Sequence, residues 1–255
     1  GLVTQGEEGL ALTWMDARVD GVVVTPRRGK PVEINAMWYN ARRILADLQR
    51  KGGATAAADE TVRLAQRTAT SFRAKFWDAS RGALMDLIAP DGTADARVRP
   101  NQLFAASLPF PLLTREQALR MLEEVRRELL TPCGLRTLAR GDPAHCGRCQ
   151  GSTVSRDNSY HQGTVWPWLL GAYVDAELYA NNGAAPVRDR LRRHLASIGG
   201  FIDQPCLGQL SEIFDSDAPH AARGCVAQAW SVAEVLRAWR RVAPEPNVQD
   251  KGEPK

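Results

Sequence analysis

The sequence has no long hydrophobic run. In its 255 residues no stretch approaches about 18 consecutive apolar residues, which excludes a transmembrane helix. It also has no dense basic run. The net charge of +4 comes mostly from arginines scattered over expected helix faces, so nucleic-acid binding is not indicated. Glycine-rich phosphate loops, HExxH and EF-hand patterns are missing too, as is a Ser or Cys nucleophile motif. Any chemistry must therefore come from other side chains.

Cysteines are few and odd in number. Five in a chain of this size favour a reducing compartment over a disulfide-stabilised fold. His145, Cys146 and Cys149, with Cys133 upstream, include a C-x-x-C pattern. A structural zinc site needs a second pair of ligands at defined spacing, and the sequence has none. We therefore expect no metal and no other cofactor.

Apolar residues recur at helical spacing through most of the chain, and the pattern predicts no long strand. The run 134–157 has no such periodicity and is expected to be a long functional loop. Helices are expected at about 31–51, 59–77, 101–108, 114–129, 164–179, 186–198 and 226–242, with a short strand pair around 84–88. The predicted fold class is all-α.

Two kinds of helix alternate. The helix at 164–179 is apolar on nearly every face, which marks it as buried, whereas the helix at 31–51 carries one stripe made of Ile34, Trp38, Ala41, Leu45 and Leu48. This alternation predicts an α/α toroid with an inner and an outer layer. The helices are too few to close such a ring. We expect residues 1–243 to be the C-terminal part of a longer barrel and residues 244–255 to be a disordered tail.

Polar and aromatic residues gather just before, or at the start of, apolar helical stretches. The runs are Trp14-Met15-Asp16, RPNQ at 99–102, YHQG at 160–163 and QLSE at 209–212. If the helix starts converge, their free N–H groups and positive dipole ends point into one polar, aromatic-lined pit. Sugars suit such a pit because their rings offer apolar C–H faces and a rim of hydroxyls. Two separated carboxylates there suggest cleavage of a glycosidic bond.

Asp16 and Glu212 are the two candidate catalytic carboxylates. The indole and thioether beside Asp16 suit a general acid, and a more polar setting for Glu212 suits a base that activates water on the opposite face of the sugar. On spacing alone, Glu33, Asp157 and Asp215 are rivals.

Further residues are candidates for contact with the sugar. His161 could serve as a base, but without a nucleophile motif a hydrogen-bonding role is favoured. For Trp166 and Trp168, core packing and lining of the pit both remain open. The full set of substrate-binding candidates is Trp14, Arg27, Glu33, Asn35, Trp38, Asn101, Gln102, Tyr160, His161, Gln162, Trp166 and Trp168.

Several blocks resemble one known family, in order, up to about Arg241. They include LTWMDA at 12–17, RPNQ at 99–102, YHQGTVWPW at 160–168 and LSEIFD at 210–215, with further matches at 24–36, 129–138 and 227–236. The chain is similar to the α-1,6-glucosidase domain of glycogen debranching enzymes.

This resemblance implies an (α/α)6 barrel related to glucoamylases and the release of α-1,6-linked glucose from trimmed branches of glycogen or limit dextrin. It also implies Asp16 as general acid, Glu212 as general base and a cytoplasmic location, where glycogen is stored.

The chain departs from that family at 145–151, where it reads HCGRCQG and relatives look like RYxGxYxG. If the relatives' aromatic residues touch substrate, the acceptor subsites are altered here. Two alternatives stay open: another toroid hydrolase such as a glucoamylase or trehalase, and a glucan-binding barrel without activity. Retention of both Asp16 and Glu212 argues against the second. The oligomeric state is not predicted.

Overall fold

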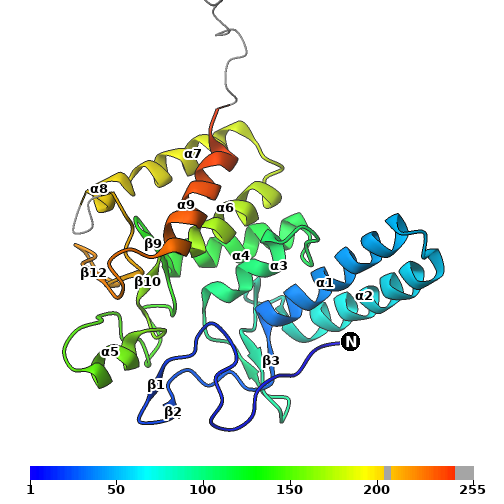
Figure 1. Ribbon diagram of the computed structural model, residues 1–255, viewed down its shortest axis with the longest axis horizontal. Coiled ribbons are helices and arrows are strands. Elements are labelled where there is room, and N and C mark those ends of the chain that lie inside the picture. Colours follow the sequence, from blue (N-terminus) through cyan, green and yellow to red (C-terminus); the bar gives the residue numbers. More distant parts are fainter. Residues whose placement is uncertain (204–207, 245–255) are drawn as a thin grey trace, which may run out of the picture.

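The computed structural model describes residues 1–203 and 208–244, and helices make up nearly half of it (Figure 1). The longer helices are α1 (Val32–Lys51), α2 (Thr55–Phe76), α4 (Arg115–Glu128), α6 (Leu169–Ala180), α7 (Ala185–Ala196) and α9 (Ala229–Val242). Between them lie η1 (Pro100–Leu103), α3 (Phe104–Ser107), α5 (Thr153–Ser159) and α8 (Gly199–Ile202). The predicted disordered tail lies outside the described residues, apart from Pro244.

The predicted helices are confirmed, with boundary shifts of a few residues, except near 164–168. There the helix begins only at Leu169, because Val165 and Trp166 form a strand and Pro167 follows. A residue before proline is pushed to extended backbone, and proline has no N–H for a helix interior. The expected loop at 134–157 is also partly wrong, since it contains a strand at its start and α5 near its end.

Short antiparallel strands make all-α too narrow a class. A five-stranded sheet has the order β12-β11-β10-β9-β8, and a three-stranded sheet has the order β3-β6-β7. The strands of these two sheets are β3 (Lys30–Pro31), β6 (Leu87–Ile88), β7 (Ala94–Asp95), β8 (Leu130–Thr131), β9 (Gly134–Arg136), β10 (Val165–Trp166), β11 (Ile213–Phe214) and β12 (Ala222–Arg223). Two further pairs join β1 (Arg18–Val19) to β2 (Val22–Val23) and β4 (Trp77–Asp78) to β5 (Ala83–Leu84). Strands do form around 84–88 as predicted, but β5 and β6 pair with other strands.

The five-stranded sheet brings distant loops together. In it Val165 of β10 is paired with Phe214 of β11 on one side and with Arg136 of β9 on the other. The loop before β10 ends in Tyr160–Thr164, and Glu212 comes directly before β11. The sheet therefore places Glu212 beside the 160–166 segment despite their distance in sequence.

Helix α6 is the centre of the hydrophobic core. It packs against α3, α4, α7 and α9. Glu177 has no exposed surface and accepts hydrogen bonds from Arg126 and Arg190, each at 2.7 Å, and from the Tyr173 hydroxyl at 2.8 Å. A buried carboxylate needs such partners, so these bonds fix α6 between α4 and α7.

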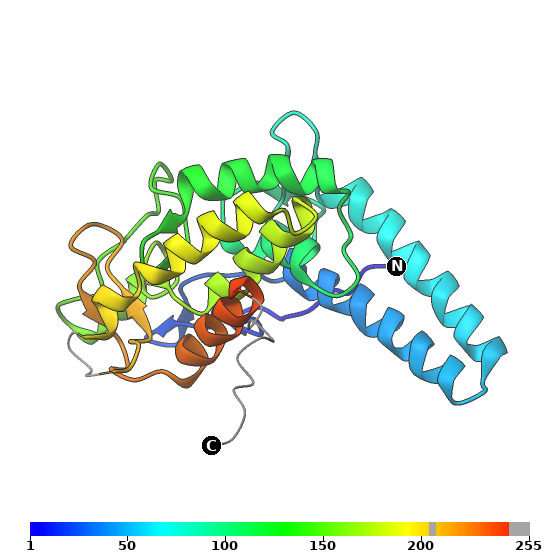
Figure 2. The same cartoon turned by 90° about the horizontal axis from the view of Figure 1, so that it is seen from above.

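Helices α1 and α2 form an antiparallel hairpin that projects from the other helices (Figure 2). Gly53, at φ 80°, makes the turn between them in the left-handed region that favours glycine. The predicted apolar stripe of α1 is present but faces largely outward. Ile34 is half-buried, but Trp38, Ala41, Leu45 and Leu48 are exposed, because α1 uses a different face (Ala36, Tyr39, Asn40) to reach the core.

Candidate active site

Asp16 and Glu212 both lie near the hydroxyl of Tyr160. Burial is the main reason why the pKa of Tyr160 is raised, and the nearby carboxylates of Glu212 and Asp16 add to it. The phenol therefore stays protonated and donates its hydrogen bond to Glu212. Asp16 reaches this point from the loop before β1, and Tyr160 stands at the C-terminal end of α5. The structure thus brings together three residues that the sequence singled out.

The carboxylate of Glu212 is held at both oxygens. The backbone N–H of Cys225 donates to Oε2 at 2.9 Å, and the side-chain Nε2 of Gln228 donates to Oε1 at 3.2 Å. The Glu212 N–H in turn donates to the Cys225 carbonyl at 2.9 Å. Glu212 is half-buried, and these hydrogen bonds fix the direction of its carboxylate.

The carboxylate of Asp16, in contrast, is not itself fixed. Asp16 is exposed, and within the described part of the chain its carboxylate has no hydrogen-bond partner. Its neighbours are anchored instead. The indole N–H of Trp14 donates to Oδ1 of Asn101 at 2.8 Å, and Met15 is fully buried, with its sulfur 3.7 Å from Nδ2 of Asn101.

Asn101 connects the Asp16 loop to a buried ion cluster. Its Nδ2 donates to Asp86 at 2.8 Å. Asp86 also accepts from Nε of Arg27 at 2.8 Å, and Arg27 makes a two-pronged ion pair with Glu33. All three charged side chains are at most 4% exposed. Although burial opposes it, the carboxylates of Asp86 and Glu33 raise the pKa of Arg27, so the guanidinium remains charged.

Six predicted sugar contacts are buried and already bonded inside the protein. Asn101 bonds Trp14 and Asp86, and Gln162 bonds Arg99 and the Val24 carbonyl. Arg27 and Glu33 pair with each other and have almost no exposed surface. Asn35 is fully buried and its amide bonds the backbone of Val3 and Pro31. The amide of Gln102 is also buried and bonds backbone atoms of neighbouring segments and Glu124. Groups whose hydrogen bonds are already made inside the protein cannot offer them to a sugar.

Trp38 lies apart from the other candidates. It stands on the outward face of α1, where the guanidinium of Arg42 covers its ring at 4.5 Å from the centroid. The aromatic contacts of the site do not include it. Its predicted place in the pit therefore finds no support within the described residues.

Trp14 is the centre of an aromatic cluster. Its ring meets those of His161, Trp166 and Trp168 edge-on, with centroids 5.1–5.4 Å apart. Trp230, at the start of α9, stacks on Trp168 at 5.2 Å. Trp166 is 2% exposed and its indole N–H donates to the Tyr160 carbonyl, so it belongs to the core. Trp14 and Trp168 are only half-buried and keep surface that a sugar ring could meet.

His161 is fully buried against Trp166, at a centroid distance of 5.3 Å and an interplanar angle of 16°. Burial, with smaller contributions from Arg99 and Arg27, lowers its pKa to about 3. Both ring nitrogens are buried without a hydrogen-bond partner among the described residues. A neutral, inaccessible imidazole argues against His161 as a base. Its carbonyl accepts from Arg99 at 2.8 Å, and Arg99 also donates to the Gln162 side chain at 2.8 Å.

The rival carboxylates have other partners or places. Asp215 is 6% exposed and makes a two-pronged ion pair with Arg223, while the Cys149 N–H donates to it at 3.0 Å. Asp157 lies on α5, and its backbone carbonyl accepts from Tyr160. Among the described residues there is no cluster of three or more side chains suited to hold a metal.

Sequence reasoning missed Asp86, Gln228 and Gly224. A lone Asp between the apolar residues Met85 and Leu87 is a signal for a buried, paired carboxylate. Gln228 stands just before an apolar helical run, which is also the position of the polar residues predicted to line the site. Gly224 gives no such signal: it matters because a Cβ there would meet Oε2 of Glu212, which only the structure shows.

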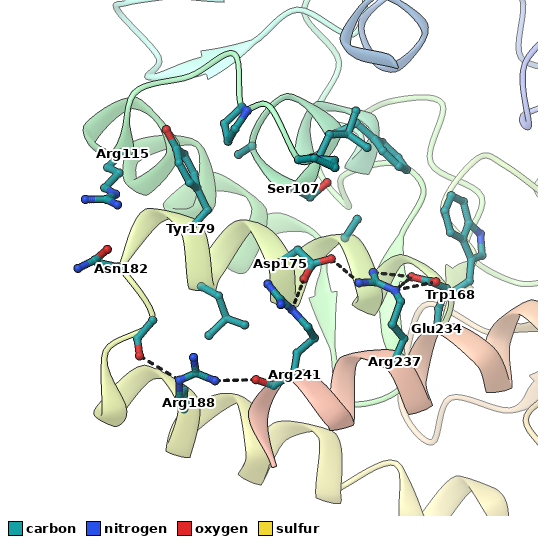
Figure 3. A pocket seen from close by; sticks show the side chains of 18 residues that line it. Ser107, Arg115, Trp168, Asp175, Tyr179, Asn182, Arg188, Glu234, Arg237 and Arg241 are labelled. Atoms are coloured by element: carbon teal, nitrogen blue, oxygen red, sulfur yellow. Dashed lines mark hydrogen bonds and ion pairs between the residues drawn. The ribbon is translucent and has the colours of Figure 1, made fainter. Parts of the chain in front are cut away.

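A pocket of about 890 Å³ runs along α6 and α9, away from both carboxylates (Figure 3). Trp168 marks its end nearest the aromatic cluster. Along it, Asp175 accepts from Arg237 at 2.5 Å and from Arg241 at 3.1 Å, and Arg237 also pairs with Glu234. These ion pairs join α6 to α9. They leave no free carboxylate for catalysis in this pocket.

Comparison with known proteins identifies the chain's relatives. A profile described as amylo-α-1,6-glucosidase matches residues 1–237. The chain belongs to this family. The glycogen debranching enzyme of Saccharomyces cerevisiae is 24% identical over an alignment 289 residues long, gaps included, that covers 92% of the chain and 19% of that enzyme. The chain therefore spans about a fifth of the length of that relative.

Solved structures similar to this amylo-α-1,6-glucosidase family member share its fold. The neutral trehalase of Saccharomyces cerevisiae matches with a TM-score of 0.61 at 15% identity, over 83% of this chain and 38% of that one. A mannosylglycerate hydrolase from Thermus thermophilus matches with a TM-score of 0.60 at 17% identity, over 83% of this chain and 46% of that one. Both are (α/α)6 toroid enzymes, so the helical arrangement is of the toroid type.

Proposed function

We propose that the chain carries a glycosidase site that releases α-1,6-linked glucose from branch points of glycogen or limit dextrin. The observation that carries this is the convergence of Asp16 and Glu212 on Tyr160, beside half-exposed faces of Trp14 and Trp168. Family membership and the debranching relative support the choice of bond and substrate. Because glycogen is a cytoplasmic store, the proposed activity is cytoplasmic. No helix in the described ranges has the length and apolar character needed to cross a membrane.

In the proposed mechanism, Asp16 is the general acid and Glu212 the general base. Asp16 is exposed and unbonded, so it can take a proton from solvent and give it to the oxygen of the departing glucan chain. Glu212, held at both oxygens, takes a proton from a water that attacks the anomeric carbon from the other face. An inverting reaction of this kind requires the two carboxyl groups to lie roughly 6.5–9.5 Å apart, which leaves room for the water between the sugar and the base.

Glucose release from phosphorylase-limit dextrin tests this proposal. The assay compares the wild type with Asp16→Asn and Glu212→Gln, in this chain and in any longer native polypeptide that contains it. We expect each variant to lose activity by at least about 10³-fold, with dextrin binding retained. Asp157→Asn is the matched control and should stay active. Maltose and trehalose as substrates separate a glucoamylase or trehalase. A folded wild type that binds dextrin but releases no glucose indicates a glucan-binding barrel.

We also propose that residues 1–243 form the C-terminal part of an (α/α)6 barrel. The support is an open side of the molecule. The outward stripe of α1 is apolar and exposed, with Leu48 at 59%, and α9 likewise exposes Trp230, Leu236 and Trp239. The pocket of Figure 3 runs along the same α9. In the similar toroid enzymes, more than half of each chain lies outside the match. Further helices against α1 and α9 would cover this surface.

Polar substitution of the stripe tests the barrel proposal. In the isolated chain, Leu45→Gln with Leu48→Gln should reduce binding of the dye 8-anilinonaphthalene-1-sulfonate. In a longer native polypeptide the same change should lower the melting temperature, because the stripe is then buried. If the isolated chain binds no dye before substitution, the stripe is not an open hydrophobic face.

A further inference from the structure

Glu212 stands directly before a hairpin, and its donors Cys225 and Gln228 both come after it. The strands β11 and β12 form this hairpin, with Ile213 paired to Arg223. Before β11, the Leu210 carbonyl accepts from the Gln228 N–H at 2.9 Å; after β12, the Cys225 N–H bonds the Glu212 carboxylate. The base is therefore held by the chain that leads from β12 into α9.

Gln228 connects this hairpin to α9. It is the residue at the N-cap position, with extended backbone, and its own carbonyl accepts the first helical bond, from Val232 at 3.2 Å. Its side chain is turned back to Oε1 of Glu212 at 3.2 Å and caps no N–H of α9. Glutamine is not a favoured capping residue, so helix formation alone does not account for its position.

Two other titratable side chains near Glu212 belong to Tyr160 and Cys225. The Tyr160 hydroxyl donates to it from the end of α5, and the thiol of Cys225 is exposed and bonds the Ala227 carbonyl at 3.4 Å. The charge of Asp16 also helps to raise the pKa of Tyr160. Gln228 is thus a neutral side-chain donor at the start of a long helix, whereas the Tyr160 phenol is also influenced by Asp16.

We propose that Gln228 is a positioning residue which fixes the direction of the Glu212 carboxylate, so that the packing of α9 determines where the base points. This inference rests on the proposed function of Glu212. A rigid donor matters here, because a base displaced by about 1 Å can slow a reaction about 100-fold. Loss of the donor also disfavours the charged form of the carboxylate.

The test compares Gln228→Leu, which removes the donor at similar size, with Gln228→Glu, which places a like charge beside Glu212. We expect kcat on limit dextrin to fall roughly 10- to 100-fold, with KM within about twofold, since the ground-state contacts are intact. The acid limb of the kcat profile should move to higher pH, furthest in Gln228→Glu. Gln66→Leu and Gln66→Glu, on the exposed face of α2, are the matched controls and should behave as wild type.

Two outcomes overturn the inference. In the first, Gln228→Leu keeps the kcat and pH profile of the wild type. In the second, kcat and KM change together with the melting temperature while the acid limb stays in place, which is the signature of a merely structural residue. If the wild type releases no glucose, the proposed function fails by itself. The inference is then decided by carbon-13 NMR titration of the Glu212 carboxyl, whose midpoint should move to higher pH in Gln228→Leu and is refuted if it does not.

Discussion

The loops that carry Asp16 and Glu212 are supported in opposite ways. Around Asp16 the protein fixes the neighbours, Trp14 and Met15, and leaves the carboxyl in solvent. Around Glu212 it fixes the carboxylate itself, through Cys225 and Gln228. In every cycle the acid must recover a proton from water and the base must release one to water. The base must also point at a mobile water molecule, whereas the acid meets an oxygen of the bound glucan. The contrast therefore matches the two roles, and substitutions on each side should separate them.

The largest effect is expected from Arg27→Met, on the Asp16 side. It leaves Glu33 and Asp86 buried without their cation, which should lower the free energy of unfolding by about 3–5 kcal/mol. Urea denaturation measures this. The neighbouring Arg28 is exposed, so Arg28→Met is the control and should change stability little. A loss below about 1 kcal/mol in Arg27→Met would mean that the ion cluster does not support the loop.

On the Glu212 side, Gly224→Ala should affect catalysis more than stability. The new Cβ meets Oε2 of Glu212 and must push the carboxylate aside, so kcat should fall about 100-fold. Gly21 shares the positive φ, 81° against 65° for Gly224, but a Cβ there meets nothing within 4 Å. Gly21→Ala therefore controls for backbone strain. Equal kcat in the two variants would show that Glu212 needs no fixed position.

Asn101→Ala should weaken the Asp16 side without touching Glu212. It leaves the Trp14 indole N–H and the Asp86 carboxylate each short of a partner, at a cost of about 1–3 kcal/mol in unfolding free energy. The freed Trp14 should also let Asp16 drift, so kcat falls. Asn158 on α5 is exposed, and Asn158→Ala provides the baseline. Unchanged stability and kcat would remove Asn101 from the support of Asp16.

His161 makes the shared aromatic cluster sensitive to acid. Its pKa is about 3 in the folded protein and about 6.5 when unfolded, so the unfolded chain binds the proton first as pH falls. Its stabilising contribution is complete above about pH 6.5 and is lost between there and pH 3, by up to about 1.4 kcal/mol per pH unit. Urea denaturation from pH 7 to pH 4 should show a smaller loss for His161→Phe than for wild type. Parallel curves would contradict the burial of a neutral imidazole.

The smallest change in stability is expected from substitutions in the outward stripe of α1. The residues that support the Asp16 and Glu212 loops lie outside this stripe. Leu45 is 48% exposed, and Leu45→Gln in the isolated chain should change the free energy of unfolding by no more than about 0.5 kcal/mol. The measurement is again urea denaturation, with Leu170→Gln in the buried α6 as the opposite case. A loss above about 2 kcal/mol for Leu45→Gln would show that the stripe is packed.

Local patterns were enough to predict most helices. Thr114 and Gln117 form a capping box in the structure, and their spacing marks the start of α4 in the sequence. The unbroken apolar character of α6 likewise predicts its burial. Most of the strands were not predicted, because a strand of two or three residues is too short to show an alternating pattern. Val165 and Trp166 look like the first turn of a helix until Pro167 is taken into account.

The site was predictable in part. Asp16, Tyr160 and Glu212 stand out because they belong to polar and aromatic runs at helix starts. Arg27, Asn35 and Gln102 stand out in the same way, yet their hydrogen bonds are made inside the protein. Sequence shows that a polar side chain needs partners, but not whether they are protein atoms or a ligand. Only the fold, which pairs Arg27 with Asp86, decides this.

The four neighbouring indoles have a spectroscopic consequence. Trp14, Trp166, Trp168 and Trp230 form a closed set of ring contacts, each indole meeting two others, with centroids 5.1–5.7 Å apart. Chromophores this close share their excited states and give a paired positive and negative band in circular dichroism. Trp14 borders the proposed sugar site, and Trp230 stands at the start of α9. Binding of a ligand or a shift of α9 should therefore change this circular-dichroism band, without the need for a label.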